Sequence, residues 1–141
     1  MISPPPYVYQ YPFELFLRFK KEMHVCRKGM KKQRTILLVC TGNLDRSPTA
    51  EDLLKATEGL EVKSAGTSRC APTLISKELI AWADRIFAME NHHKDAILSI
   101  APTAEEKVVV LDIADRYRRG DPDLIKLLKV KLTPHLGRLW E

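Results

Sequence analysis

Four short apolar stretches alternate with four longer amphipathic stretches along most of this chain. The apolar stretches are residues 35–40, 60–66, 85–89 and 107–113, and the amphipathic ones are residues 47–57, 73–83, 91–100 and 121–132. Short apolar or alternating runs predict strands, whereas apolar residues at helical spacing predict amphipathic helices. Because strands that alternate with helices form right-handed β-α-β units, the pattern predicts an α/β fold built on a parallel sheet.

Two of the predicted helices carry signals for their first residue. Ser47 and Asp121 are good N-cap residues, and a proline follows each of them at the position that proline tolerates best in a helix. We therefore expect Ser47 to cap the first of these helices and Asp121 to cap the last.

Residues 1–34 differ in composition from residues 35–141, which we expect to be the folded domain. The first segment holds four of the nine prolines, six of the ten aromatic residues and a surplus of six positive charges, although the whole chain carries only +5. Phenylalanines at helical spacing within residues 13–19 indicate a short basic amphipathic helix that could dock on a membrane surface or a partner. The alternative is a non-native or disordered extension, and we expect residues 1–29 to be dispensable for the chemistry.

The composition excludes several classes of protein. No apolar run approaches the roughly 20 residues that a membrane span needs, and the N-terminus is polar and proline-rich where a signal peptide is apolar. Three cysteines cannot all pair, which argues against a secreted disulfide scaffold. Because the positive surplus lies in the first 34 residues and not in the domain, we expect a cytoplasmic protein with neither nucleic acid nor membrane as its partner.

The segment that follows the first predicted strand carries the chemistry. Ligands of parallel α/β sheets bind beyond the carboxyl ends of the strands. A loop between a strand end and a helix start directs backbone N–H groups into one concavity, and Gly42 gives it conformational freedom. Arg46 adds a planar fork of donors that matches two oxygens of a tetrahedral dianion. The predicted phosphate-binding residues are Thr41, Gly42, Asn43, Leu44, Asp45, Arg46 and Ser47.

Cys40 ends the first predicted strand beneath this loop. The helix dipole and Arg46 should stabilise its thiolate. A thiolate beneath a bound phosphate is placed for in-line attack at phosphorus, while the loop stabilises charge on the equatorial oxygens of the transition state. A lone cysteine is otherwise a small buried hydrophobe, but here the strand, the glycine, the arginine and the helix come in the order that a phosphate loop requires.

Three segments resemble the low-molecular-weight protein tyrosine phosphatase family. ILLVCTGNLDRSPTAE (residues 36–51) is similar to its phosphate-binding loop, and KSAGT (residues 63–67) and WADRIFAMENHH (residues 82–93) are similar to its second and third strands. The resemblance implies a three-layer α/β/α fold with a four-stranded parallel sheet. It also implies a phosphatase that hydrolyses a phosphate monoester through a phosphocysteine intermediate, with no metal or other cofactor. The substrate would be a phosphorylated protein or a small phosphomonoester, and inorganic phosphate would be the product.

The resemblance also assigns roles within the loop. Cys40 would be the nucleophile and Arg46 the oxyanion clamp, Ser47 would hydrogen-bond the thiolate, and Asn43 would hold the loop in shape. The family usually has a second cysteine just before the arginine, where it can form a protective disulfide with the nucleophile. This chain has Asp45 there. An unpaired carboxylate that faces the phosphate would be costly, so we expect Asp45 to point outward, where it could orient Arg46 or cap the next helix.

A general acid must protonate the leaving group. In the family this is an Asp-Pro pair followed by aromatic residues, after the fourth strand. Asp121 precedes a proline, but its position as a helix cap already explains it. Asp115 follows the fourth predicted strand more closely, and Tyr117 stands where the family has an aromatic wall. We favour Asp115 as the catalytic acid, with Asp121 as the second candidate and Asp112 as the third.

Other charged and titratable residues have weaker claims. His92 and His93 lack the spacing of metal ligands, so we expect them in the first turn of a helix without a metal. Arg116, Arg118 and Arg119 are equally consistent with attraction of phosphorylated substrates and with a solvated loop.

Two other functions remain open at this stage. A non-catalytic phosphate- or phosphoprotein-binding module would follow if Asp45 compromised the chemistry. An arsenate reductase would need two further cysteines to relay a disulfide, and only Cys70 lies downstream of Cys40. A disulfide between Cys70 and Cys40 is conceivable.

Overall fold

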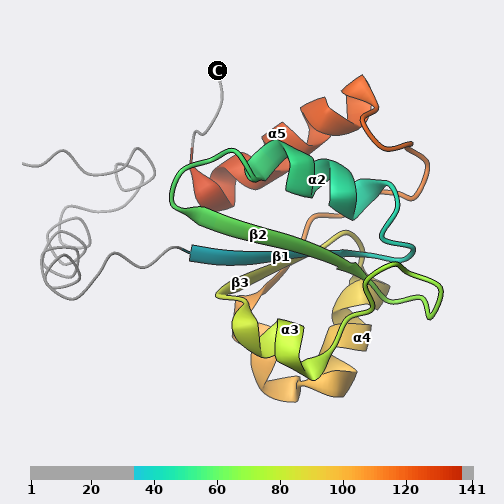
Figure 1. The fold of residues 1–141 in the computed structure, drawn as a ribbon, viewed down its shortest axis with the longest axis vertical. Coiled ribbons are helices and arrows are strands. Elements are labelled where there is room, and N and C mark those ends of the chain that lie inside the picture. Colours follow the sequence, from blue (N-terminus) through green and yellow to red (C-terminus); the bar gives the residue numbers. More distant parts are fainter. Residues whose placement is uncertain (1–33, 138–141) are drawn as a thin grey trace, which may run out of the picture.

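The structure, a computed structural model, describes residues 34–137. The helix expected at residues 13–19, and all of the expected extension except Arg34, lie outside the described residues. Four parallel strands form one sheet, as expected, and their order in it is β2-β1-β3-β4 (Figure 1). The strands are β1 (Arg34–Cys40), β2 (Leu60–Gly66), β3 (Arg85–Ala88) and β4 (Val108–Val110).

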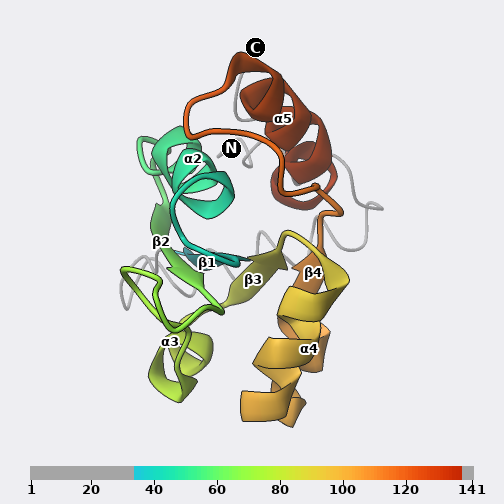
Figure 2. The same ribbon diagram turned by 90° about the vertical axis from the view of Figure 1, so that its right-hand side faces the viewer.

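Helices cover both faces of this sheet. They are α2 (Arg46–Leu54), α3 (Lys77–Trp82), α4 (Asn91–Ile100) and α5 (Pro122–Leu136), with the 3-10 helix η2 (Pro102–Lys107) before β4. Helices α2 and α5 lie on one face, and α3 and α4 lie on the other (Figures 1 and 2). The expected three-layer α/β/α architecture is confirmed. Within the described chain, no helix is long and apolar enough to cross a bilayer.

The central strand β1 explains why its sequence is a continuous apolar run. Ile36 and Leu38 pack in one core with Leu124 and other residues of α2 and α5. Leu37 and Val39, which point to the opposite face, pack in the second core with α3 and α4. Successive side chains of a strand alternate between the faces of a sheet, so a strand covered on both sides must be apolar at every position.

The strand order fixes where a ligand site opens. The chain leaves β1 into α2 on one face and leaves β3 into α4 on the other, so the two connections diverge beyond neighbouring carboxyl ends (Figure 2). Ligands of open parallel sheets bind at such a switch point. The loop after β1 therefore meets the segments that follow β3 and β4.

Ser47 is not the N-cap of α2, contrary to the sequence prediction. The helix begins one residue earlier, at Arg46, and Asp45 stands at the cap position without a side-chain cap hydrogen bond. The Ser47 hydroxyl instead lies 3.0 Å from the Cys40 sulfur, the partner that the family resemblance implied. The helix also ends at Leu54 rather than residue 57.

Other boundaries differ from the prediction for identifiable reasons. The helix predicted from residue 73 begins at Lys77, because Ser76 caps it and the preceding residues pair with Gly66. Strand β4 ends at Val110 rather than residue 113, and Asp112 adopts a left-handed backbone with φ 59°. Helix α5, which Asp121 caps as predicted, continues to Leu136, whose side chain is buried in the first core. The strand predicted at residues 60–66 and the helix at 91–100 have the expected bounds.

We expect Gly66→Ala to lower the free energy of unfolding by about 2 kcal/mol or more, as overpacking of a tight site does. A Cβ atom there would lie 2.5 Å from the Thr41 carbonyl oxygen and 2.8 Å from the Ala71 Cβ. Gly42→Ala is the matched control in the same region, because its Cβ would meet only the Leu44 side chain at 3.9 Å. Urea unfolding of both variants measures the difference, and equal stabilities would contradict the argument.

Candidate active site

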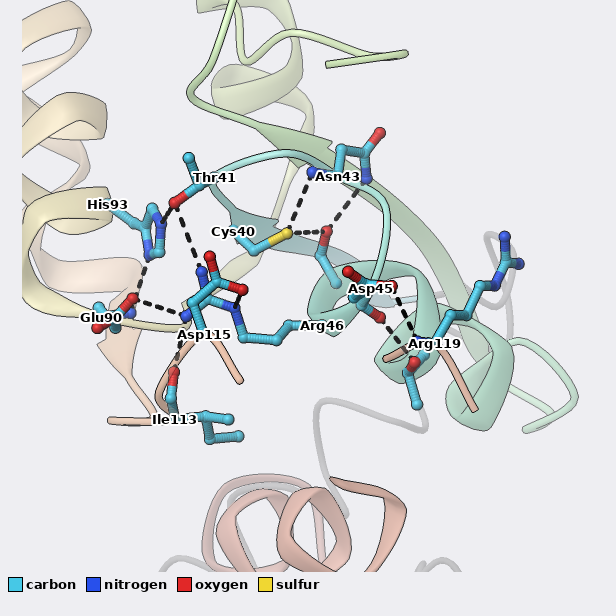
Figure 3. Close-up of polar contacts among 12 residues, drawn as sticks. Cys40, Thr41, Asn43, Asp45, Arg46, Glu90, His93, Ile113, Asp115 and Arg119 are labelled. Atoms are coloured by element: carbon cyan, nitrogen blue, oxygen red, sulfur yellow. Dashed lines mark hydrogen bonds and ion pairs between the residues drawn. The ribbon is translucent and has the colours of Figure 1, made fainter. Parts of the chain in front are cut away.

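The Cys40 sulfur lies at the bottom of the loop that joins β1 to α2, and the residue as a whole is 2% exposed. The Asn43 backbone N–H donates to it at 3.2 Å, and the Ser47 hydroxyl lies 3.0 Å away (Figure 3). The same hydroxyl accepts a hydrogen bond from the Asn43 side-chain amide, so its own proton can go to the sulfur at 3.0 Å or to the Ala65 carbonyl oxygen at 3.4 Å. Both groups can hydrogen-bond the sulfur of a nucleophilic Cys40 thiolate.

Asn43 provides the sharp bend of the loop. Its φ is 54°, whereas Gly42 has no positive φ, so the glycine is not the residue that supplies the left-handed conformation. The Asn43 amide also donates to the Ser64 hydroxyl at 2.9 Å, and its oxygen accepts from the Thr73 backbone N–H at 3.3 Å. These contacts offset the roughly 1–2 kcal/mol that a left-handed non-glycine residue costs.

Arg46 is the largest fully buried side chain in the described part of the protein, with 1% exposure. Its Nη1 donates to Glu90 Oε1 and to the Ile113 carbonyl oxygen, both at 2.7 Å. Its Nη2 lies 3.5 Å from the Thr41 hydroxyl, and its Nε lies 3.7 Å from Asp115 Oδ1 (Figure 3). The protein thus fixes the guanidinium through Nη1, while the Nε–Nη2 edge makes only long contacts and can bind two oxygens of an anion.

Glu90 compensates the buried charge of Arg46. The hydrogen bond from the guanidinium, with its positive charge, holds the pKa of Glu90 below its usual value despite partial burial. Removal of one partner of such a pair would leave an unpaired charge in the interior, which costs several kcal/mol. Glu90 is therefore the positioning residue for Arg46.

His93 links this pair to the phosphate loop. Its Nδ1 accepts the Glu90 backbone N–H at 3.0 Å, so the neutral ring carries its proton on Nε2 and donates it to the Thr41 hydroxyl at 2.8 Å. Burial, with the nearby charges of His92 and Arg46, lowers the pKa of His93 to about 4. The ring is therefore neutral near pH 7 and orients Thr41.

The predicted acids occupy different positions. Asp115 lies beside Arg46 and is 64% exposed, which suits a group that exchanges protons with substrate and water. Asp121 accepts the Asp123 backbone N–H at 2.8 Å as the cap of α5. Asp112 is exposed in its left-handed position after β4. The geometry brings only Asp115 of these three into contact with the loop arginine.

Asp45 points outward, as expected, but to a partner that the sequence did not indicate. Its Oδ1 accepts the Arg119 backbone N–H at 2.9 Å, and its side chain neither caps α2 nor contacts Arg46 (Figure 3).

The two remaining loop residues, Gly42 and Leu44, form the rim of the loop, and the Leu44 side chain is 61% exposed. A cavity of about 380 Å³ lies beside this rim and not over the sulfur, with Pro48, Pro72 and Leu79 among its lining residues.

Sequence reasoning missed Glu90 and His93 as parts of this site. His92 and His93 lie in the first turn of α4, as expected, and Glu90 is its N-cap. Glu90 follows the carboxyl end of β3, where ligand sites of parallel sheets lie, and this position could have identified it as a site residue. Glu90, His92 and His93 bring potential metal ligands within 4.8 Å of one another. Both ring nitrogens of His93 and one oxygen of Glu90 already bind protein groups, which favours the structural role over a metal site.

Cys70 does not form a disulfide with Cys40 in this structure. Both are free thiols, Cys40 buried and Cys70 exposed.

Known proteins similar to this chain are phosphatases by name. The family model described as low molecular weight phosphotyrosine protein phosphatase matches residues 35–74. A protein-arginine-phosphatase of Geobacillus stearothermophilus is 32% identical, over 75% of this chain and 93% of that protein. The low molecular weight protein-tyrosine-phosphatase Etp of Escherichia coli K12 is 31% identical, over 63% of this chain and 81% of that protein. The crystal structure of the tyrosine phosphatase Wzb of Escherichia coli K30 in complex with phosphate matches with a TM-score of 0.60 and 27% identity. The match covers 70% of this chain and 93% of that one.

We expect His93→Gln to reduce the loss of stability on acidification. An unfolded histidine takes up a proton near pH 6.5, whereas folded His93 resists protonation down to about pH 4. The wild-type protein should therefore lose up to roughly 3 kcal/mol between these pH values because of His93. His135, whose pKa burial also lowers, contributes in both proteins and cancels in the difference.

Urea unfolding at several pH values between 4 and 7 measures this effect. His92→Gln removes one of the charges that lower the pKa of His93 but keeps its burial, the largest cause, so this variant should keep most of the wild-type pH dependence. The same pH dependence in His93→Gln and wild type would refute the assignment of a neutral, buried His93.

Proposed function

This chain belongs to the low-molecular-weight protein tyrosine phosphatase family, and from that membership we propose that it removes phosphate from phosphotyrosine in protein substrates. It is a cysteine-dependent phosphatase with a parallel α/β fold. The observation that carries the residue assignment is the convergence of three groups at one site, two of them from the segment between β1 and α2 and one from the segment after β4. A sulfur with two donors aimed at it, the open edge of a buried guanidinium and a nearby carboxyl group are the parts that phosphoryl transfer to a thiolate needs.

In the first step the Cys40 thiolate attacks phosphorus. The backbone N–H groups of the loop and the Nε–Nη2 edge of Arg46 bind the equatorial oxygens, where negative charge is spread in the transition state. The bond between phosphorus and the phenolic oxygen breaks, and Asp115 in its acid form donates a proton to the leaving phenolate. The products of this step are the dephosphorylated tyrosine and a phosphocysteine.

In the second step a water molecule attacks the phosphocysteine. Asp115, now a carboxylate, takes a proton from this water, and the bond between phosphorus and sulfur breaks. The Ser47 hydroxyl and the Asn43 N–H stabilise the departing thiolate through the contacts that they make with Cys40. Inorganic phosphate leaves, and the enzyme returns to its starting state.

The surroundings of the site support phosphotyrosine as the substrate. Leu44 is exposed on the rim and offers apolar surface to a phenyl ring, and Tyr117, two residues after Asp115, is half-buried against the first core. The cavity beside Leu44, lined by apolar side chains and by charged ones such as Glu51 and Lys63, offers room for a neighbouring residue of a protein substrate. One relative is a protein-arginine-phosphatase, so phosphoarginine is the competing substrate to test.

A catalytic thiol works only while it is reduced, which supports a location in the cytoplasm.

We expect Cys40→Ser to abolish turnover while inorganic phosphate still binds, because the thiolate attacks and the loop and Arg46 hold the anion. Release of phosphate from peptides that carry phosphotyrosine, phosphoarginine or phosphoserine measures turnover, and calorimetry measures binding. The wild-type protein should prefer the phosphotyrosine peptide. Unchanged hydrolysis by Cys40→Ser would overturn the mechanism, and a preference for phosphoarginine would overturn the substrate.

We expect Asp115→Asn and Asp121→Asn to fail in different ways. Loss of a general acid lowers kcat/KM for phenyl phosphate by about 100-fold, but lowers it much less for p-nitrophenyl phosphate, whose leaving group needs little protonation. Loss of a helix cap costs about 1 kcal/mol of stability with no dependence on the leaving group. Steady-state kinetics and thermal unfolding of both variants test this. The reverse result would make Asp121 the acid.

A further inference from the structure

The segment that carries Asp115 is attached to the start of α2. We call residues 114–121 the acid loop. The backbone N–H of Arg119 donates to Asp45 Oδ1 at 2.9 Å, and the backbone N–H of Gly120 donates to the Thr49 hydroxyl oxygen at 3.0 Å. The Thr49 hydroxyl in turn donates to the Asp45 carbonyl oxygen at 2.6 Å. Two consecutive backbone groups of the acid loop thus bind the first turn of α2.

A side-chain pair extends this attachment by one more turn of the helix. The Arg119 guanidinium donates to both oxygens of Asp52, through Nε and Nη2, each at 3.0 Å. Partial burial of Asp52 opposes ionisation, but the hydrogen bonds from Arg119 and Lys55 hold the pKa of Asp52 below its usual value. The pair is largely exposed, so it adds little stability by itself, but its two parallel bonds fix the orientation of Arg119.

Helix α2 therefore positions both the arginine of the phosphate loop and the loop that carries the general acid. Its first residue is Arg46, the arginine of the phosphate loop. Its N-cap Asp45, with Thr49 and Asp52 of its first two turns, holds Arg119 and Gly120. Asp115 lies four residues before Arg119 and 3.7 Å from the Arg46 Nε. Within the acid loop the backbone hydrogen bonds are short-range, from Arg116 to Ala114 and from Asp121 to Arg118. The contacts with α2, together with the packing of the half-buried Tyr117 against the first core, restrict the position of the loop relative to the phosphate site.

We propose that Asp45 and Asp52 are positioning residues for the general acid: they anchor the acid loop to α2 and so hold Asp115 over the leaving group. This inference rests on the proposed function, in which Asp115 is that acid. Asp45 acts as a hydrogen-bond acceptor for the Arg119 backbone, and its negative charge is not what matters. A catalytic group that is mobile before the reaction is less effective, because it loses conformational entropy when it becomes ordered in the transition state.

The acceptor role distinguishes Asp45→Asn from Asp45→Ala. Asparagine keeps an oxygen that can accept the Arg119 N–H, whereas alanine removes it. We expect Asp45→Ala to lower kcat/KM for phenyl phosphate by about tenfold and for p-nitrophenyl phosphate by clearly less, a fraction of the general-acid effect. Asp45→Asn should restore most of the phenyl phosphate activity. Asp52→Asn should show a smaller loss with the same dependence on the leaving group.

A double-mutant cycle with Asp115→Asn tests whether the anchor acts through the acid. In the Asp115→Asn background, Asp45→Ala should add no further dependence on the leaving group, because the group that it positions is gone. Asp95→Asn, which changes an exposed carboxylate on α4 across the sheet, is the control for a change of charge. Thermal unfolding of each variant confirms that it is folded under the assay conditions.

The outcomes separate the anchor from the proposed function. If Asp45→Asn loses as much activity as Asp45→Ala, or if both increase phosphate affinity, Asp45 acts by its charge on the anion and the anchor is refuted. If the Asp45→Ala effect persists in full without Asp115, the anchor does not act through that acid. If Asp115→Asn itself shows no dependence on the leaving group, the acid assignment in the proposed function has failed instead.

Discussion

A positive charge in the interior of the protein governs the construction of the site. Arg46 is almost fully buried, and a buried guanidinium is stable only if its donors and its charge are both compensated. Glu90 and the Ile113 carbonyl oxygen supply that compensation at one nitrogen, Nη1. The protein thereby keeps the arginine rigid without using the edge that an anion needs. Rigid donors are effective in catalysis because they need no reorganisation during the reaction.

The topology of the sheet makes this compensation possible. Cys40 ends β1, Glu90 follows β3, and Ile113 lies three residues after the end of β4. Parallel strands deliver their carboxyl ends to one edge of the sheet, and the switch point between β1 and β3 leaves space there for a loop. His93 then joins the two sides, because it contacts both the Glu90 backbone and Thr41 of the phosphate loop.

The phosphate loop and the acid loop are coupled through the same helix. Asp45 is the last residue before α2, and its carboxylate turns toward Arg119 and not toward the sulfur. A carboxylate beside an anion site repels the anion unless it is held away from it, and the hydrogen bond from the Arg119 backbone does this. Asp45, the residue before Arg46, thus binds the acid loop through Arg119, which lies 74 residues further along the chain.

The sequence by itself determined the local features of this protein. Periodicity predicted the four strands and four helices, and the cap of α5, because these depend on residues close together in the chain. The order of a buried strand, Cys40, Gly42, Arg46 and a helix start predicted the phosphate loop for the same reason. Only the tertiary structure decided which groups meet across the chain. Glu90 lies 44 residues from Arg46 and Ile113 lies 67, and no local pattern encodes a contact that depends on strand order. Ser47 could equally cap its helix or face the thiol, and the position of the Cys40 sulfur decided between them.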